Sequence, residues 1–167
     1  MAIDYVEDLR STVIGAAERL QGVSDCIAAR RADEAKWSCK EIIGHLVDSA
    51  ANNHQRFVRA QFQEDLIFAG YAQVEWVGAQ NYQEAPWANL VLLWREFNLH
   101  LAHVIESMPS TERTRLRHRH NLDEIAWKPV SANEPTTLDY FMRDYVDHLH
   151  HHLRQVEALL RLHAEEV

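Results

Sequence analysis

The hydrophobic positions of this chain recur at intervals of three and four residues, the period of an amphipathic α-helix. Residues 3–21 show the pattern first, with one apolar stripe formed by Tyr5, Leu9, Val13, Ala16, Ala17 and Leu20. A second helix is predicted from the stretch WSCKE to about residue 63. Its start is indicated by Ser38 and Glu41, which have the spacing of a capping box.

Two further helices are predicted in the second half of the chain. Pro86 suits the start of the first, which ends where SMPS interrupts the pattern, and its apolar positions are Leu90, Leu93, Trp94, Phe97, Leu101, Val104 and Ile105. The other opens at EPTTLDY, where threonines can act as caps, and continues to about residue 163. Four such helices predict an all-α four-helix bundle. Long connections, roughly 64–85 and 109–136, follow the second and third helices, with room for short helices or a lid.

Composition narrows the class of protein. A length of 167 residues without a Gly-, Pro- or Ser-rich linker predicts a single domain over residues 1–167. A formal net charge of -8 argues against a nucleic-acid partner. The one basic cluster is RTRLRHRH at 113–120. Its last four residues, RHRH at 117–120, are expected to be a solvated loop, with a cationic loop near the mouth of a site as the alternative.

The N-terminal residues and the cysteines indicate a compartment. The first fifteen residues are acidic where a secretory signal is basic, and no apolar run approaches membrane-spanning length. We therefore expect a cytoplasmic protein with no membrane partner. Cys26 and Cys39 match no metal or redox motif, so both are expected to be free thiols.

A run of histidines lies in the fourth predicted helix, in the stretch DYVDHLHHHLRQ at 144–155. At 100° per residue, His152 falls near the middle of the apolar face and His148 on its flank, one turn earlier. His150 and His151 are expected to project outward into solvent. The apolar face used for this placement consists of Tyr145, Leu149, Val156 and Leu159.

An H-x-x-x-H pair on one helical face can present two imidazole nitrogens to one cation. His45 in the second helix is the candidate third ligand, although a histidine at this position can also be a hydrogen-bonded core residue. The metal interpretation is favoured by a polar strip on the same helix, formed by His45, Ser49, Asn52 and Arg56, because buried polar groups are costly unless satisfied. His100 and His103 are expected to be solvated or to pack, without binding metal.

Two motifs together resemble a known family. The stretch WSCKEIIGHLVDSAANNHQRF at 37–57 resembles the W-S-x-x-E-x-x-x-H-L-x-D signature of the DinB/YfiT-like superfamily, and DHLHHHLRQVEAL resembles its C-terminal H-x-x-x-H helix. The resemblance implies a four-helix bundle that binds a divalent metal, zinc or nickel first and iron as a further option, through His45, His148 and His152. Asp147 is a departure, since YfiT-type relatives often have tryptophan there.

The resemblance also implies a function. It suggests a thiol-dependent S-transferase that joins a low-molecular-weight thiol, such as bacillithiol, mycothiol or glutathione, to a small electrophilic substrate, and it suggests a homodimer. Three imidazoles with open coordination positions are typical of a catalytic metal rather than a structural one. Two alternatives remain open: a hydrolase that uses metal-bound water, and a non-catalytic bundle that binds metal or a small ligand.

Four more residues are candidates for supporting roles. Asp48 and Asp144 each lie within one turn of a proposed ligand and can orient an imidazole, or they can be ordinary surface carboxylates. Arg56 can receive a substrate carboxylate, or it can form an ion pair within the bundle. Asn52 is a substrate-binding candidate with the same ambiguity.

Overall fold

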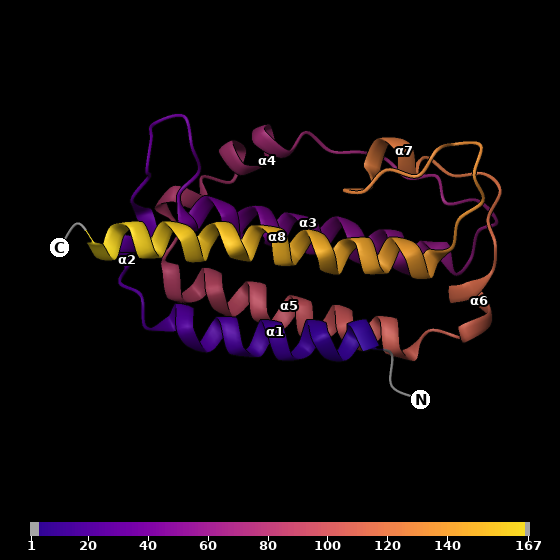
Figure 1. The fold of residues 1–167 in the computed structure, drawn as a ribbon, viewed down its shortest axis with the longest axis horizontal. Helices are drawn as coiled ribbons and strands as arrows, with labels where there is room; N and C mark the ends of the chain where they lie inside the picture. The colour runs from indigo at the N-terminus through magenta and orange to yellow at the C-terminus, as the bar shows by residue number, and fades with distance from the viewer. Residues whose placement is uncertain (1–3, 166–167) are drawn as a thin grey trace.

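Four long helices form the body of the molecule in the computed structural model, which describes residues 4–165. They are α1 (Asp4–Gln21), α3 (Cys39–Ala60), α5 (Trp87–Ser107) and α8 (Leu138–Glu165). Figure 1 shows them side by side as a bundle, in which α3 packs against α5 and α8, and α1 packs against α5. Within the described residues there are helices and two isolated β-bridges but no strand. The predicted all-α four-helix bundle is confirmed.

The predicted helix starts are also confirmed. The Ser38 hydroxyl accepts a hydrogen bond from the Glu41 N–H at 3.3 Å, and the Glu41 carboxylate accepts one from the Ser38 N–H at 2.9 Å. This capping box satisfies two of the backbone donors that the start of α3 leaves free. At the start of α8, the Thr137 hydroxyl accepts from the Tyr140 N–H at 3.1 Å. Helix α3 ends at Ala60, three residues before the predicted end.

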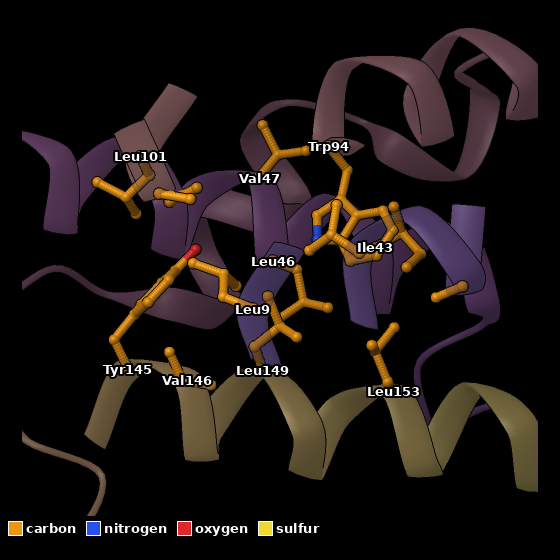
Figure 2. Close-up of a cluster of buried hydrophobic side chains, with 14 of the residues drawn as sticks. Leu9, Ile43, Leu46, Val47, Trp94, Leu101, Tyr145, Val146, Leu149 and Leu153 are labelled. Carbon is orange, nitrogen blue, oxygen red and sulfur yellow. The ribbon is translucent and has the colours of Figure 1, made fainter. Parts of the chain in front are cut away.

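The core lies between the four long helices. Figure 2 shows how Leu9, Trp94 and Leu149, among others, converge from α1, α5 and α8 on side chains of α3. All six members of the predicted α1 stripe are buried. Leu93 was predicted to face the core but is 52% exposed. The reason is that the buried arc of α5 runs through Trp94 and Leu101, and Leu93 lies about 100° away from Trp94.

The connections contain short helices, as the sequence suggested. The first holds α4 (Gln73–Ala79) and the 3-10 helix η1 (Tyr82–Glu84), and the second holds α6 (Ser110–Thr114) and α7 (Leu122–Ile125). A further short helix, α2 (Asp25–Ala29), follows α1. In Figure 1, α4 and α7 lie on the α3 and α8 side of the bundle, away from α1 and α5. The two connections are joined by backbone hydrogen bonds, including one from the Leu66 N–H to the Arg119 carbonyl at 3.0 Å.

The basic stretch 117–120 was expected to be solvated, and this was wrong for Arg117 and His120, which are buried. The Arg117 guanidinium donates to the carbonyls of Gln63 and Glu64 at 2.6 and 2.8 Å. Carbonyls just beyond a helix end have no partner within the helix, so they need an outside donor. Arg117 therefore ties the second connection to the end of α3.

Gly44 allows the ring of Tyr82 to lie directly against α3. A Cβ at position 44 would come within 2.2 Å of two Tyr82 ring atoms, a distance that real contacts do not reach. The group that approaches α3 at this glycine is a tyrosine ring from η1. Its hydroxyl donates to Asp48 at 2.7 Å, so the ring is held at both ends.

We expect Gly44→Ala to lower the free energy of unfolding by about 1–3 kcal/mol, because the added methyl group must displace the Tyr82 ring. The measurement is urea unfolding followed by circular dichroism. Gly78→Ala in α4 is the matched control, since a Cβ there meets no atom within 4 Å, and helix propensity should make it neutral or slightly stabilising. Of the two variants, only Gly44→Ala should therefore lower the free energy of unfolding. If Gly44→Ala in a Tyr82→Ala background costs as much as in the wild type, the proposed clash is not the cause.

Two expectations from composition can be compared with the structure. Cys26 is exposed and Cys39 is buried, and both are free thiols, as predicted. Among the described residues, no helix is both long enough and apolar enough to cross a membrane.

Candidate metal centre

Three imidazoles from two helices meet inside the bundle. His45 comes from α3, and His148 and His152 come from successive turns of α8. One nitrogen of each lies within 4.8 Å of the others, and the Nε2 atoms of His45 and His148 are 3.3 Å apart. No other group of three His, Cys, Asp or Glu side chains in residues 4–165 meets the same spacing. The structure therefore brings the three sequence candidates together.

The spacing of these nitrogens fits a divalent cation. Two nitrogen ligands at about 2.0–2.1 Å from a tetrahedral ion lie about 3.3 Å apart, close to the observed separation of His45 and His148. The second ring nitrogen of His45, Nδ1, is buried and has no hydrogen-bond partner. Such an unsatisfied polar atom is costly in a protein interior. The two Nε2 atoms form a separate, part-buried contact, and a cation between them could accept a lone pair from each.

The imidazoles are held in the neutral form that binds metal. Burial lowers the pKa of His45 to about 4, with a further contribution from the nearby His152. Burial also lowers the pKa of His148 to about 3, and the neighbouring histidines add to the shift. The pKa of His152 is lowered by burial as well. All three rings therefore offer a lone pair at neutral pH.

These low pKa values predict a pH-dependent stability for the metal-free chain. Below the ordinary histidine pKa of 6.5, the unfolded chain takes up protons that folded His45 and His148 do not accept. We therefore expect the Tm of chelator-treated protein to fall as pH decreases from 6.5 toward 4. The control is a variant with His45→Gln and His148→Gln, in which this part of the pH dependence should be absent. An identical pH dependence in both proteins would contradict the assignment.

Gln155 orients one of the rings. The Nδ1 of His152 lies 2.8 Å from the Gln155 Oε1, so Nδ1–H donates to the amide oxygen and Nε2 keeps its lone pair. The Gln155 Nε2 in turn donates to His151 at 3.1 Å. A hydrogen bond on the far nitrogen is the usual way in which a protein orients a ligating histidine. Sequence reasoning missed Gln155, whose i,i+3 spacing from His152 was the available signal.

Two tryptophan rings lie against the histidines. The Trp37 ring lies 5.2 Å from the His45 ring, measured between centroids, and Trp127 packs against His151 and His148 at 5.2 and 6.3 Å. Trp127 comes from the connection between α7 and α8. It was not singled out from the sequence, because nothing local links it to the histidines. His151, which was expected to project into solvent, is half-buried against Trp127.

Asp144 and Asp147 hold the Trp127 segment in place. The Asp144 carboxylate accepts from the backbone N–H groups of Trp127 and Lys128 at 2.8 and 2.7 Å. Asp147 forms an ion pair with the Lys128 ammonium at 2.6 Å. The hydrogen bonds found for Asp144 therefore go to this segment and not to an imidazole. Asp147 stands where YfiT-type relatives often have tryptophan, and in this chain the tryptophan near His148 comes from the connection.

A pocket of about 380 Å³ opens beside the imidazoles. Helix α3 contributes Ser49, Asn53 and Arg56 to its wall, and α8 contributes His148 and His152. The rest of the wall comes from α8 and the two connections, and consists of Tyr71, Gln73, Glu124, Ile125, Ala126, Trp127, Phe141, Asp144, Tyr145 and His151. The site thus has a mainly polar wall with a few apolar side chains, which is suited to a small molecule.

Asp48 and Asn52 lie away from this pocket. Asp48 accepts hydrogen bonds from Tyr82 and Gln80 at 2.7 and 2.6 Å, which anchors the α4–η1 segment, and burial raises its pKa. Asn52 donates to the Asp48 carbonyl at 2.9 Å and lines a separate, shallower pocket. Its neighbour Asn53 lines the pocket beside the histidines instead. One residue makes this difference, because adjacent helical positions point about 100° apart.

The remaining histidine candidates lie outside the centre. His150 pairs with Asp8 at 2.9 Å on the α1 side of α8. His100 and His103 are exposed on α5, and the His100 ring lies 5.2 Å from that of His54. None of these three belongs to the group of closely spaced ligand atoms.

Comparisons with known proteins identify similar chains. A family model described as the DinB superfamily matches residues 9–156. The solved structure of YfiT from Bacillus subtilis, described as "a probable metal-dependent hydrolase with an unusual four-helix bundle topology", matches with a TM-score of 0.77 at 18% sequence identity. The match covers 96% of this chain and 86% of YfiT. No curated protein matches the sequence.

Proposed function

This chain belongs to the DinB superfamily, and from that premise we propose that it is a metal-dependent enzyme whose cation is held by His45, His148 and His152. The observation that carries the proposal is the meeting of three neutral imidazoles, within 4.8 Å of one another, beside a pocket of about 380 Å³. Imidazole ligands suit zinc, nickel and iron. Three protein ligands leave coordination positions free for substrate.

The proposed reaction is an S-transfer, in which a low-molecular-weight thiol is joined through its sulfur to a small electrophile. A divalent cation acts as a Lewis acid and lowers the pKa of a thiol or water molecule that it binds. A thiol with a pKa of about 8.5 is already close to ionising at neutral pH, whereas water has a pKa of about 15.7. In the reaction, sulfur bonds to the electrophilic carbon, and the thiol proton leaves with the displaced group.

The carboxylates of the pocket favour S-transfer over hydrolysis. Hydrolysis is helped by a general base within hydrogen-bond reach of the attacking water. Asp144 lines the pocket, but its two oxygens already accept from backbone N–H groups, and Glu124 is exposed. A thiol that ionises on binding has less need of such a base.

Metal-dependent hydrolysis is the second candidate, favoured by the description of YfiT as a probable hydrolase. One experiment separates the two. Zinc- and nickel-loaded protein is assayed for loss of free thiol with an aryl halide, using glutathione, mycothiol and bacillithiol in turn, and for cleavage of activated esters without thiol. Chelator-sensitive thiol consumption supports S-transfer, and chelator-sensitive ester cleavage supports a hydrolase. Metal binding without turnover in either assay would leave a non-catalytic metal-binding bundle.

We also propose that the chain forms a homodimer, as the family resemblance implies. Two adjacent leucines of α5, Leu92 and Leu93, are about half exposed, and apolar surface of this kind is suited to a contact between copies. Light scattering coupled to gel filtration tests this proposal, and a monomeric mass would contradict it.

A further inference from the structure

One wall of the pocket carries a buried positive charge that has no carboxylate partner in residues 4–165. Arg56 is only 6% exposed, and its guanidinium donates to the Ala69 carbonyl at 2.8 Å and to the Asn53 Oδ1 at 3.3 Å. Among the described residues, no ion pair to Arg56 is found. A buried charge is costly unless it is paired and hydrogen-bonded. Two neutral oxygens satisfy only part of a group with five N–H donors.

Arg117, the other deeply buried arginine, has a carboxylate partner, although its Nε is also buried without a hydrogen bond. It donates to several backbone carbonyls and pairs with Glu112 at 3.2 Å. Arg117 lies in neither the histidine pocket nor the shallower one beside it, whereas Arg56 lines both. Arg56 therefore differs in having no carboxylate partner within the described part of the chain and in lining two pockets.

The neighbours of Arg56 in the pocket add hydrogen-bond donors. Burial raises the pKa of Tyr71 to about 12, so its hydroxyl keeps its proton at neutral pH and can donate. Ser49 lines the same wall one helical turn before Asn53. Phe141 packs below the guanidinium, 6.0 Å from ring centre to Cζ, and gives this end of the pocket an apolar floor.

The acidic groups of the pocket do not compensate Arg56. Asp144 is engaged by the Trp127 and Lys128 backbone, and Glu124 is an exposed residue of α7. Burial is the main influence on Arg56 and lowers its pKa, with only the Tyr71 hydroxyl acting in the other direction. An anion that enters the pocket would therefore meet a desolvated and unneutralised guanidinium.

We propose that the substrate of this site carries a carboxylate, which binds to the Arg56 guanidinium and the Tyr71 hydroxyl while the reacting atom lies at the three imidazoles. The guanidinium fork matches the two oxygens of a carboxylate, and the apolar floor of Phe141 suits an organic body. This inference rests on the proposed function and adds a substrate class to it. In an S-transfer, the carboxylate can belong to the thiol or to the electrophile.

The geometry of α3 also indicates how the substrate lies. His45 and Arg56 are eleven residues apart on one helix, which corresponds to about 16 Å of axial rise. The Arg56 side chain lines the same pocket as His148 and His152, the two imidazoles that meet His45. The carboxylate is therefore remote from the reacting atom, and its binding energy serves to position the substrate.

Binding of phenylacetate tests the inference, with the neutral phenylacetamide and inorganic phosphate as comparison probes. Titrations are followed by NMR on the metal-free and the zinc-loaded full chain. We expect phenylacetate to bind at least about tenfold more tightly than phenylacetamide, and Arg56→Met to weaken phenylacetate binding by about tenfold or more in both forms. Arg56→Lys, which keeps the charge but not the fork, should fall between wild type and Arg56→Met.

Arg59→Met is the matched control, since Arg59 lies one turn further along α3, is exposed and bonds to Gln55 at 2.9 Å. It should leave phenylacetate binding unchanged. Thermal unfolding of each variant shows whether Arg56 is needed for folding, and Arg56→Lys then serves as the variant that retains the positive charge.

Three outcomes would overturn the inference. The first is that phenylacetate and phenylacetamide bind equally well. The second is that wild type and a folded Arg56→Met bind phenylacetate equally well. The third is that phosphate binding depends on Arg56 but phenylacetate binding does not. Metal loading is measured separately, so the two proposals can fail separately. Zinc binding without phenylacetate selectivity removes only this inference, whereas phenylacetate selectivity without any metal binding removes only the proposed metal-dependent function.

Discussion

Replacing His148 with alanine is expected to abolish high-affinity metal binding. The wild-type chain, purified without a histidine tag or a nickel column, should bind about one divalent ion. Changing residues that merely orient a ligand typically weakens metal affinity by about 10–100-fold, so removing one of three ligands should weaken it by more than about 100-fold. The measurement is metal content by mass spectrometry, with zinc affinity by competition against a chromogenic chelator. His45→Ala should behave in the same way from the other helix.

His150→Ala is the matched control for this prediction. His150 lies two residues from His148 on α8 but pairs with Asp8 at 2.9 Å, on the α1 side of the helix. Its loss should therefore leave metal content unchanged. Equal loss of metal in His150→Ala and His148→Ala would indicate non-specific binding by the histidine-rich stretch, and retention in all variants would contradict the three-histidine centre.

Replacing Arg117 with methionine is expected to lower the free energy of unfolding by about 3 kcal/mol. Methionine fills most of the same volume but cannot donate to the carbonyls of Gln63 and Glu64, and those acceptors remain in place. Leaving a buried acceptor unsatisfied costs about 1–3 kcal/mol. The change should also loosen the connection between α5 and α8, because Arg117 and Thr136 exchange backbone hydrogen bonds there. Urea unfolding provides the measurement.

Arg119→Met is the control for the second prediction. Arg119 lies two residues further on and is exposed, and its partner is Asp65 at 2.9 Å. Exposed ion pairs contribute about 0–1 kcal/mol, so this variant should be nearly as stable as the wild type. If the two methionine variants are equally stable, the buried hydrogen bonds of Arg117 do not hold the connection.

The long helices were predictable because their determinants are local. A stripe of apolar side chains, a capping box at Ser38 and a proline at 86 act within a few turns, so their effect is visible along the chain. The histidine pair on α8 was predictable for the same reason, since residues four apart lie on one face of a helix. The family motifs then indicated that His45 joins them.

The rest of the site depends on contacts between residues far apart in the chain. Trp127 reaches His148 only because Asp144 binds the backbone of its segment. Arg117 is buried only because the end of α3 supplies carbonyls to it. Neither partner can be identified from periodicity, because a connection without a repeating pattern carries no local signal of what it will touch.

The sequence by itself determined the helices, the bundle and the three histidines that lie on inward faces, because helical periodicity and capping depend on neighbouring residues. The tertiary structure alone decided that Asp48 and Asp144 anchor the connections, and that Arg56 is buried with no carboxylate partner among the described residues. These features depend on which elements pack against each other, since a rotation of α3 would move Asp48 and Arg56, and a rotation of α8 would move Asp144.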